Sequence, residues 1–185
     1  MALTAEVLFI NPDYFKRVTQ LSGSIDESWF VPPIILAQDK YLQVYLGTQL
    51  FEKLKTEVSQ AGGPTGEYAT LLDTYVRKVT AWWSMVELIP SLYVQMDNGG
   101  LVIRTAENTQ AITPNDLNRQ IEGARNSAQF YSKQMYRYLC DNESLFPEYS
   151  ANTGSDIQPE SALYTQNGYT ITGTYPSKNW REFIG

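Results

Sequence analysis

The feature that most constrains the fold of this chain is a long apolar helical pattern in the middle of the sequence. Large apolar residues recur there at alternating steps of four and three residues, the spacing of one face of an α-helix. They are Tyr68, Leu72, Tyr75, Val79, Trp82, Val86, Ile89 and Tyr93. Leu71, Val76, Trp83 and Leu88 widen the stripe until little polar face is left. We therefore predict that this helix is the buried centre of a helical domain.

A membrane span is the rival interpretation of this pattern, because the segment has about the length of a bilayer core. Glu87 is the only charged residue between Val79 and Met96, and it argues against a span together with Pro90 and several polar residues. Pro90 is expected to kink or locally unwind the helix. Glu87 is either an acid with a function or, as we prefer, a carboxylate that is hydrogen-bonded to a neighbour or faces a groove.

Three further helices are expected around the central one. The first starts near Pro32-Pro33 and runs through Ile34 to Leu46, where Gly47 breaks it; Thr48 then caps a second helix of sequence TQLFEKLKTEVSQ. Residues 61–66 form a glycine-rich loop. The last helix opens at Thr113-Pro114, a cap followed by a first-turn proline. Its apolar stripe is Leu117, Ile121, Ala124, Ala128, Tyr131, Met135 and Tyr138.

These patterns predict a mainly α fold: a small bundle of about four helices with a long central helix and a short strand or hairpin loop, plus extended N- and C-terminal arms. Residues 1–149 make the helical domain, in which residues 1–30 form an irregular or short-strand arm. Residues 150–185 form an extended C-terminal arm. At 185 residues the chain is long enough for one full core and too short for two comfortable domains.

The composition removes most catalytic chemistry. The chain has no histidine, which is the usual general base and the commonest metal ligand. Cys140 is its single cysteine, so neither an internal disulfide nor a cysteine-rich metal site can form. No full phosphate-binding fingerprint is present, and no pair of acids stands out as a glycosidase pair. We therefore expect no catalytic, cofactor-binding or metal-binding residues, and no enzyme.

The charge balance argues against a dedicated DNA-binding module. The net charge is −6, whereas tight binding to a phosphate backbone needs a basic patch and a positive balance. The last helix does carry a basic stripe opposite its apolar one, made of Arg119, Arg125, Lys133 and Arg137. Such a stripe is usually a solvated face, and the alternative is that it pairs with an acidic surface on a partner.

The loop between the two longest helices, MDNGGLVIRTAENTQAITP, is a candidate contact element. Asn98, Gly99 and Gly100 supply the backbone freedom that a sharp reversal needs, and Leu101-Val102-Ile103 leaves it as a short strand. Arg104 and Glu107 then lie on the exposed part of the loop. The other interpretation, a phosphate-cradling nest at the glycine pair, has only a weak signal behind it.

The C-terminal 45 or so residues have almost no periodic pattern, yet they are too rich in large apolar residues for a disordered tail. We predict an arm that contacts a neighbouring chain, with packing on its own domain as an equal alternative. The segment 168–174 alternates and fits a strand added to a sheet edge. The arm's candidate interface residues are Tyr164, Tyr169, Tyr175, Trp180 and Phe183.

The order of these parts resembles the head–tail connector (adaptor, ring or head-completion) proteins of tailed bacteriophages, most closely those of phages of Bacteroidetes, including the crAss-like group. The resemblance covers roughly residues 30–149 and rests on four stretches and their order. They are PPIILAQDKYLQVYLGTQLFEKLKTEV, EYATLLDTYVRKVTAWWSMVELIPSLYV, DNGGLVIRT and LCDNESLFPEY. None of these is a catalytic motif.

The resemblance implies a structural virion protein without enzymatic activity. It implies a ring of about twelve copies below the portal protein, in which neighbouring copies make heterologous side-to-side contacts. The ring would join capsid to tail and extend the DNA channel. The partners would be other copies, the portal, further neck or tail rings, and genomic DNA that passes without tight binding. On this resemblance no membrane would be involved, and the protein would reside in the virion neck after assembly in the host cytoplasm. The alternatives are a non-viral helical adaptor and an enzyme using Glu87 or Asp97 with Tyr93.

Overall fold

The computed structural model describes residues 6–19, 21, 25–97, 100–103, 113–150 and 157–159, and this part of the chain is mainly helical, as predicted. The helices are α1 (Pro12–Thr19), α2 (Val31–Ala37), α3 (Gln43–Leu46), α4 (Thr48–Ser59), α5 (Gly66–Leu71), α6 (Arg77–Tyr93), α7 (Pro114–Asp141) and α8 (Pro147–Ser150). Short 3₁₀ turns cover Glu27–Trp29 and Glu143–Leu145. Strands β1 (Val94–Asp97) and β2 (Gly100–Ile103) form the hairpin.

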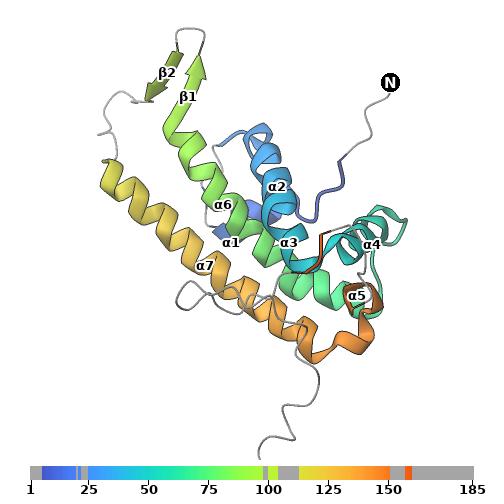
Figure 1. Ribbon diagram of the computed structural model, residues 1–185. Helices are drawn as coiled ribbons and strands as arrows, with labels where there is room; N and C mark the ends of the chain where they lie inside the picture. The colour runs from blue at the N-terminus through green and yellow to red at the C-terminus, as the bar shows by residue number, and fades with distance from the viewer. Residues whose placement is uncertain are drawn as a thin grey trace, which may run out of the picture.

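The predicted central helix is present and nearly continuous. A π-helical segment, Leu72–Val76, joins α5 to α6 without a break, so the chain is helical from Gly66 to Tyr93. Pro90 lies inside α6 and the helix ends three residues after it. A second π-helical segment, Gln38–Leu42, joins α2 to α3 in the same way. Figure 1 shows α6 through the middle of the molecule, with α7 antiparallel to it and α2 crossing it.

Helix α6 is buried on two opposite faces, which lie in two separate apolar clusters. One face, with Val79, Trp83, Val86 and Ile89, packs into the larger cluster with α4, α5 and α7. The opposite face packs Ala81 and Leu88 against α1, α2 and Phe30, which directly precedes α2. A helix that is apolar almost all round is stable only when it is covered in this way.

The N-terminal segment differs from the prediction of an irregular or short-strand arm. Residues 12–19 are helical, so that prediction is wrong for this stretch. The Asn11 side chain accepts a hydrogen bond from the Tyr14 amide at 2.8 Å, and Pro12 occupies the first turn. Phe15 is fully buried and its ring meets the ring of Phe30 edge-on at 5.3 Å. The described part of this segment belongs to the core of the domain.

Gln38 fixes the start of that segment to the helical body. Its side chain is completely buried; its Oε1 accepts from the Phe9 amide at 2.8 Å, and its Nε2 donates to the Val7 carbonyl at 3.0 Å. Phe9 in turn lies edge-on to Phe51 of α4 at 5.5 Å. A buried amide that satisfies two backbone groups is costly to remove, because the freed groups stay buried without partners.

Helix ends follow the predicted signals with one exception. Thr113 caps α7, since its hydroxyl accepts from the Asp116 amide at 3.2 Å, and the predicted apolar stripe of α7 packs into the larger cluster. Thr48 does not cap α4; it is the first helical residue, and Gly47 precedes it at φ 73°. Only glycine adopts that backbone conformation readily. The carbonyl of Ile157 instead accepts the Thr48 amide at 3.1 Å.

The predicted short strand is one arm of an antiparallel hairpin, in which Val94 pairs with Ile103 and Asp97 with Gly100. The predicted apolar stripe ends at Tyr93, which is also the last residue of α6, and the backbone turns into β1 at Val94. Within the described ranges no helix combines the length and the apolar character that crossing a membrane requires.

We predict that Gln38→Leu lowers the free energy of unfolding by about 2–3 kcal/mol, because it leaves the buried Phe9 amide without a partner at similar side-chain volume. Chemical denaturation followed by circular dichroism measures this. The matched control is Gln49→Leu on the exposed face of α4. Equal midpoints for the two variants would contradict the role of Gln38.

Candidate interaction surfaces

The hairpin β1–β2 stands beyond the helical body. It continues the end of α6, at the same end of the molecule as the start of α7, and Figure 1 shows it extending away from the other helices. Of the candidate interface residues, Gly100 lies in the described part and begins β2 opposite Asp97. Asn98, Gly99, Arg104 and Glu107 lie outside the described residues, as do Tyr164, Tyr169, Tyr175, Trp180 and Phe183.

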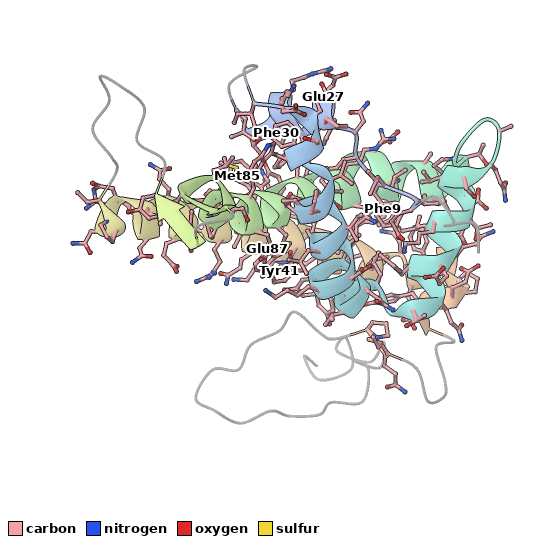
Figure 2. The ribbon with its side chains drawn as sticks, turned by 90° about the horizontal axis from the view of Figure 1, so that it is seen from above. Phe9, Glu27, Phe30, Tyr41, Met85 and Glu87 are labelled. Carbon is pink, nitrogen blue, oxygen red and sulfur yellow. The ribbon has the colours of Figure 1, made fainter. Side chains whose placement is uncertain are left out.

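Glu87, the one acid of α6, is held by two donors from the neighbouring helix. Glu87 Oε1 accepts from Tyr41 Oη at 2.6 Å and from Lys40 Nζ at 2.8 Å. The Tyr41 ring stacks on Trp83 with centroids 3.8 Å apart and planes within 11°. Trp83 then donates from Nε1 to Ser132 of α7 at 3.0 Å. Figure 2 shows Tyr41 and Glu87 adjacent where the α2 helix crosses α6.

The electrostatics of this cluster keep Glu87 ionised. Burial raises the pKa of its carboxyl, but the hydrogen bonds from Lys40 and Tyr41 outweigh burial and hold the pKa below the ordinary value. Burial and the bond to Glu87 raise the pKa of Tyr41. A paired carboxylate with a lowered pKa is a poor proton acceptor at neutral pH. The preferred interpretation of Glu87, a hydrogen-bonded carboxylate, is therefore confirmed.

A second cluster closes the other end of the bundle. Phe146 is fully buried and meets the rings of Tyr68 and Tyr138, while Tyr149 is 4% exposed. Tyr68 donates to Glu148 at 2.7 Å; burial, followed by this bond, raises the pKa of Tyr68 to about 12. Phe146, Glu148 and Tyr149 belong to the LFPEY stretch, whereas Tyr68 lies in α5 and Tyr138 in α7. The LFPEY stretch thus folds back onto these two helices. Its role in the described structure is packing.

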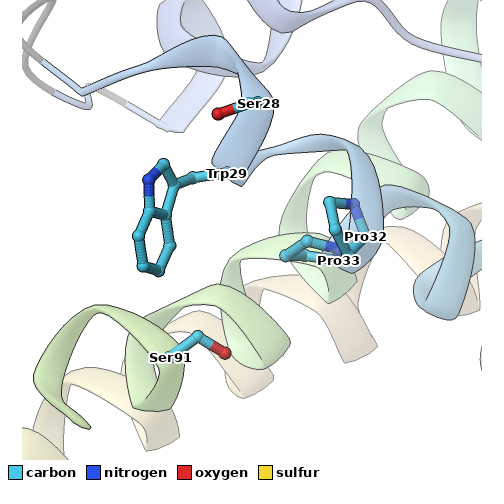
Figure 3. A pocket seen from close by; sticks show the side chains of 5 residues that line it. All are labelled: Ser28, Trp29, Pro32, Pro33 and Ser91. Atoms are coloured by element: carbon cyan, nitrogen blue, oxygen red, sulfur yellow. The ribbon is translucent and has the colours of Figure 1, made fainter. Parts of the chain in front are cut away.

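The structure also contains an apolar surface hollow that the sequence analysis missed. It has a volume of about 290 Å³ and is lined by Ser28, Trp29, Pro32, Pro33 and Ser91, so it lies between the start of α2 and the end of α6 (Figure 3). Its sequence signal is the exposed run of Trp29, Val31 and Pro32. Residues 28–33 and Ser91 are far apart in the sequence, and only the crossing of α2 over α6 brings them together.

The outer face of α7 carries the predicted basic stripe. Arg119, Lys133 and Arg137 are exposed, and Arg125 is half-buried beside Glu122. Phe130 lies in this stripe and is 55% exposed. A large aromatic side chain at such exposure is one of the features by which interfaces differ from other surfaces.

The described start of the C-terminal arm touches its own subunit, since the Ile157 carbonyl is the acceptor for the Thr48 amide. Residues 160–185 lie outside the described residues. Among the residues that the structure describes, acidic side chains and Cys140 do not gather into a group that fits a metal ion.

We predict that Glu87→Gln lowers the free energy of unfolding by about 1 kcal/mol at neutral pH. The charge-assisted bonds are lost, while the half-exposed Lys40 keeps the effect small. The folded pKa of Glu87 is lowered, so its contribution is present above the ordinary pKa of 4.5 and is lost as pH falls through the folded value.

Chemical denaturation of the wild-type protein and of Glu87→Gln at a series of acidic pH values measures the difference in their free energies of unfolding. This difference should shrink toward low pH. The control is Glu52→Gln on the exposed side of α4, which should show no such difference. A destabilisation by Glu87→Gln that stays constant into strong acid would contradict this assignment.

Comparison with curated proteins and with solved structures finds no match. A family model does match, over residues 42–159, which run from the π-helical segment before α3 to the last described residues of the arm. The matched range contains both long helices, the hairpin and the Phe146 cluster. Since this range is well over half of the chain, the protein belongs to the DUF6712 family, a family of unknown function.

Proposed function

We propose that this protein is a structural subunit of a ring in the head–tail connector, or neck, of a tailed bacteriophage. The observation that carries the proposal is the long antiparallel pair of α6 and α7, which supports a hairpin beyond the helical body. A projecting hairpin on a rigid pair of helices is suited to contact with another large protein. It offers little enclosure for a small ligand, which needs a concave site.

The stretches that carry the resemblance to connector proteins have structural roles in this chain, which supports the proposal. Gln38 binds the N-terminal segment, Gly47 turns the chain between α3 and α4, and Phe146 closes the end of the bundle. Such residues preserve a shape. A protein whose distinguishing residues preserve a shape is more consistent with an assembly part than with an enzyme.

The charge of the chain suits a channel through which DNA must slide. A net charge of −6 on every copy of a ring repels phosphate at short range, so the genome passes without being held. The exposed cations of α7 are few, and Arg119 and Arg125 lie beside Asp116 and Glu122. In the proposed ring, about twelve copies contact one another side by side around the portal protein.

The first test is native mass spectrometry of the chain, alone and mixed with the portal protein encoded by the same genome. We expect a complex with a mass of about twelve copies on the portal. A matched control replaces the hairpin residues 94–103 by a short glycine–serine linker, and this variant should bind less well while staying folded. A strict monomer in both conditions would refute the ring role and favour a helical adaptor.

We also predict that the isolated chain forms no complex with duplex DNA tighter than about 1 µM at physiological salt. Fluorescence anisotropy with a labelled duplex measures this. The double variant Asp116→Lys, Glu122→Lys makes the exposed face of α7 basic and serves as the sensitivity control, since it should gain measurable affinity. Tight binding by the unchanged chain would show that the charge argument is wrong.

A further inference from the structure

The α2 side of the molecule carries an apolar ridge beside the hollow. Pro32 and Leu36 are four residues apart in α2 and share one face of that helix, and Trp29 ends the 3₁₀ turn that precedes it. Trp29 is 36% exposed and Leu36 is 45% exposed. Apolar side chains that line up on an exposed helix face, next to a hollow, mark an interaction surface.

The hollow is suited to an apolar occupant, because most of its lining is apolar. That lining is the indole of Trp29 and the rings of two prolines (Figure 3). Of the two serines beside them, Ser91 donates from its hydroxyl to the Glu87 carbonyl at 3.3 Å, and the Ser28 amide donates to Asp26 at 2.8 Å. An aromatic side chain can stack on the apolar part of this lining.

The rim of this surface carries a net negative charge. Asp26 and Glu27 precede Trp29 by three and two residues, and both are exposed. Asp39 is exposed further along the helix that follows. The two lysines nearby are each paired with an acid, Lys16 with Glu27 at 3.1 Å and Lys40 with Glu87 at 2.8 Å. The acids therefore outweigh the bases beside the hollow, and we call this charge the acidic rim.

The outer face of α7 has the opposite arrangement. Phe130, at 55% exposure, is followed by Lys133 and Arg137 at steps of three and four residues, so a protruding ring lies among exposed cations. Figure 1 shows that α7 and α2 lie on different sides of α6. The two surfaces of one molecule thus cannot meet each other, while those of two neighbouring copies can.

We propose that Phe130 of one copy inserts into the hollow beside Trp29 of the next copy, with the cations of α7 facing the acidic rim. This inference rests on the proposed ring function and identifies the surfaces that make its side-to-side contact. Because the two surfaces differ, the contact is heterologous, and each copy keeps one free surface of each kind until the ring closes.

The test measures self-association of the full chain by sedimentation velocity. Phe130→Asp removes the inserted ring, and Trp29→Asp blocks the hollow; Leu36→Asp blocks the ridge without touching the hollow. Each variant should raise the dissociation constant about ten-fold or more. The control is Leu145→Asp, because Leu145 is 42% exposed and lies outside both surfaces, so this change should have no effect.

Mixing two blocked variants gives the decisive result. Phe130→Asp keeps an intact hollow and Trp29→Asp keeps an intact Phe130, so an equal mixture should form dimers and nothing larger. A symmetric contact through one surface would give no such rescue. Unchanged association of the Phe130 and Leu36 variants would overturn the proposed contact and leave the ring role standing.

The failure of this inference is distinguishable from the failure of the proposed function. The contact alone is overturned if the wild-type chain stays monomeric at the highest concentration reached and the Phe130→Asp variant loads onto the portal as well as the wild-type chain does. The ring role falls only if the wild-type chain also fails to load onto the portal.

Arg137→Glu should weaken association, and more so at low salt, because the cations face an acidic rim.

Discussion

The whole structure depends on covering α6 from every side. This helix has apolar residues on two opposite faces, and Glu87 is its only charged residue beyond the first turn. No orientation of it on a simple two-layer bundle would therefore bury both faces. Helix α7 covers one face, and α2 with α1 covers the other. The N-terminal segment becomes part of the domain for this reason, since Phe15 and Phe30 complete the second cluster.

Glu87, the only charged residue of α6 beyond its first turn, shows how a polar group is accommodated in such a helix. Glu87 lies on the border between the two buried faces, where Tyr41 and Lys40 reach it. A buried carboxylate without donors would destabilise the fold, whereas one that accepts two hydrogen bonds adds a specific tie between α6 and the α2 helix. The tie extends through Trp83 to Ser132 of α7, so three elements are held in register.

Long-range periodicity made the large helices predictable, while short elements and crossings were not. Thr113-Pro114 was recognised as a helix start because a long apolar stripe follows it. Asn11-Pro12 has the same chemistry, but only eight residues of helix follow it, too few to show a periodic pattern. The two π-helical segments leave no pattern that differs from an α-helix. The hairpin could be predicted from the glycine pair. The hollow could not, because it forms only where the crossing of α2 over α6 brings Trp29 close to Ser91.

The burial of α6 within one molecule also bears on the proposed ring. A molecule whose central helix is already covered has a folded core of its own, so a ring of copies would have to use surfaces on the outside. In our proposal those surfaces are the outer faces of α2 and α7 and the hairpin beyond the body. Small contacts between prefolded copies are weak singly. They would become stable when a ring closes or a larger partner supplies a template, because each later contact is then effectively intramolecular.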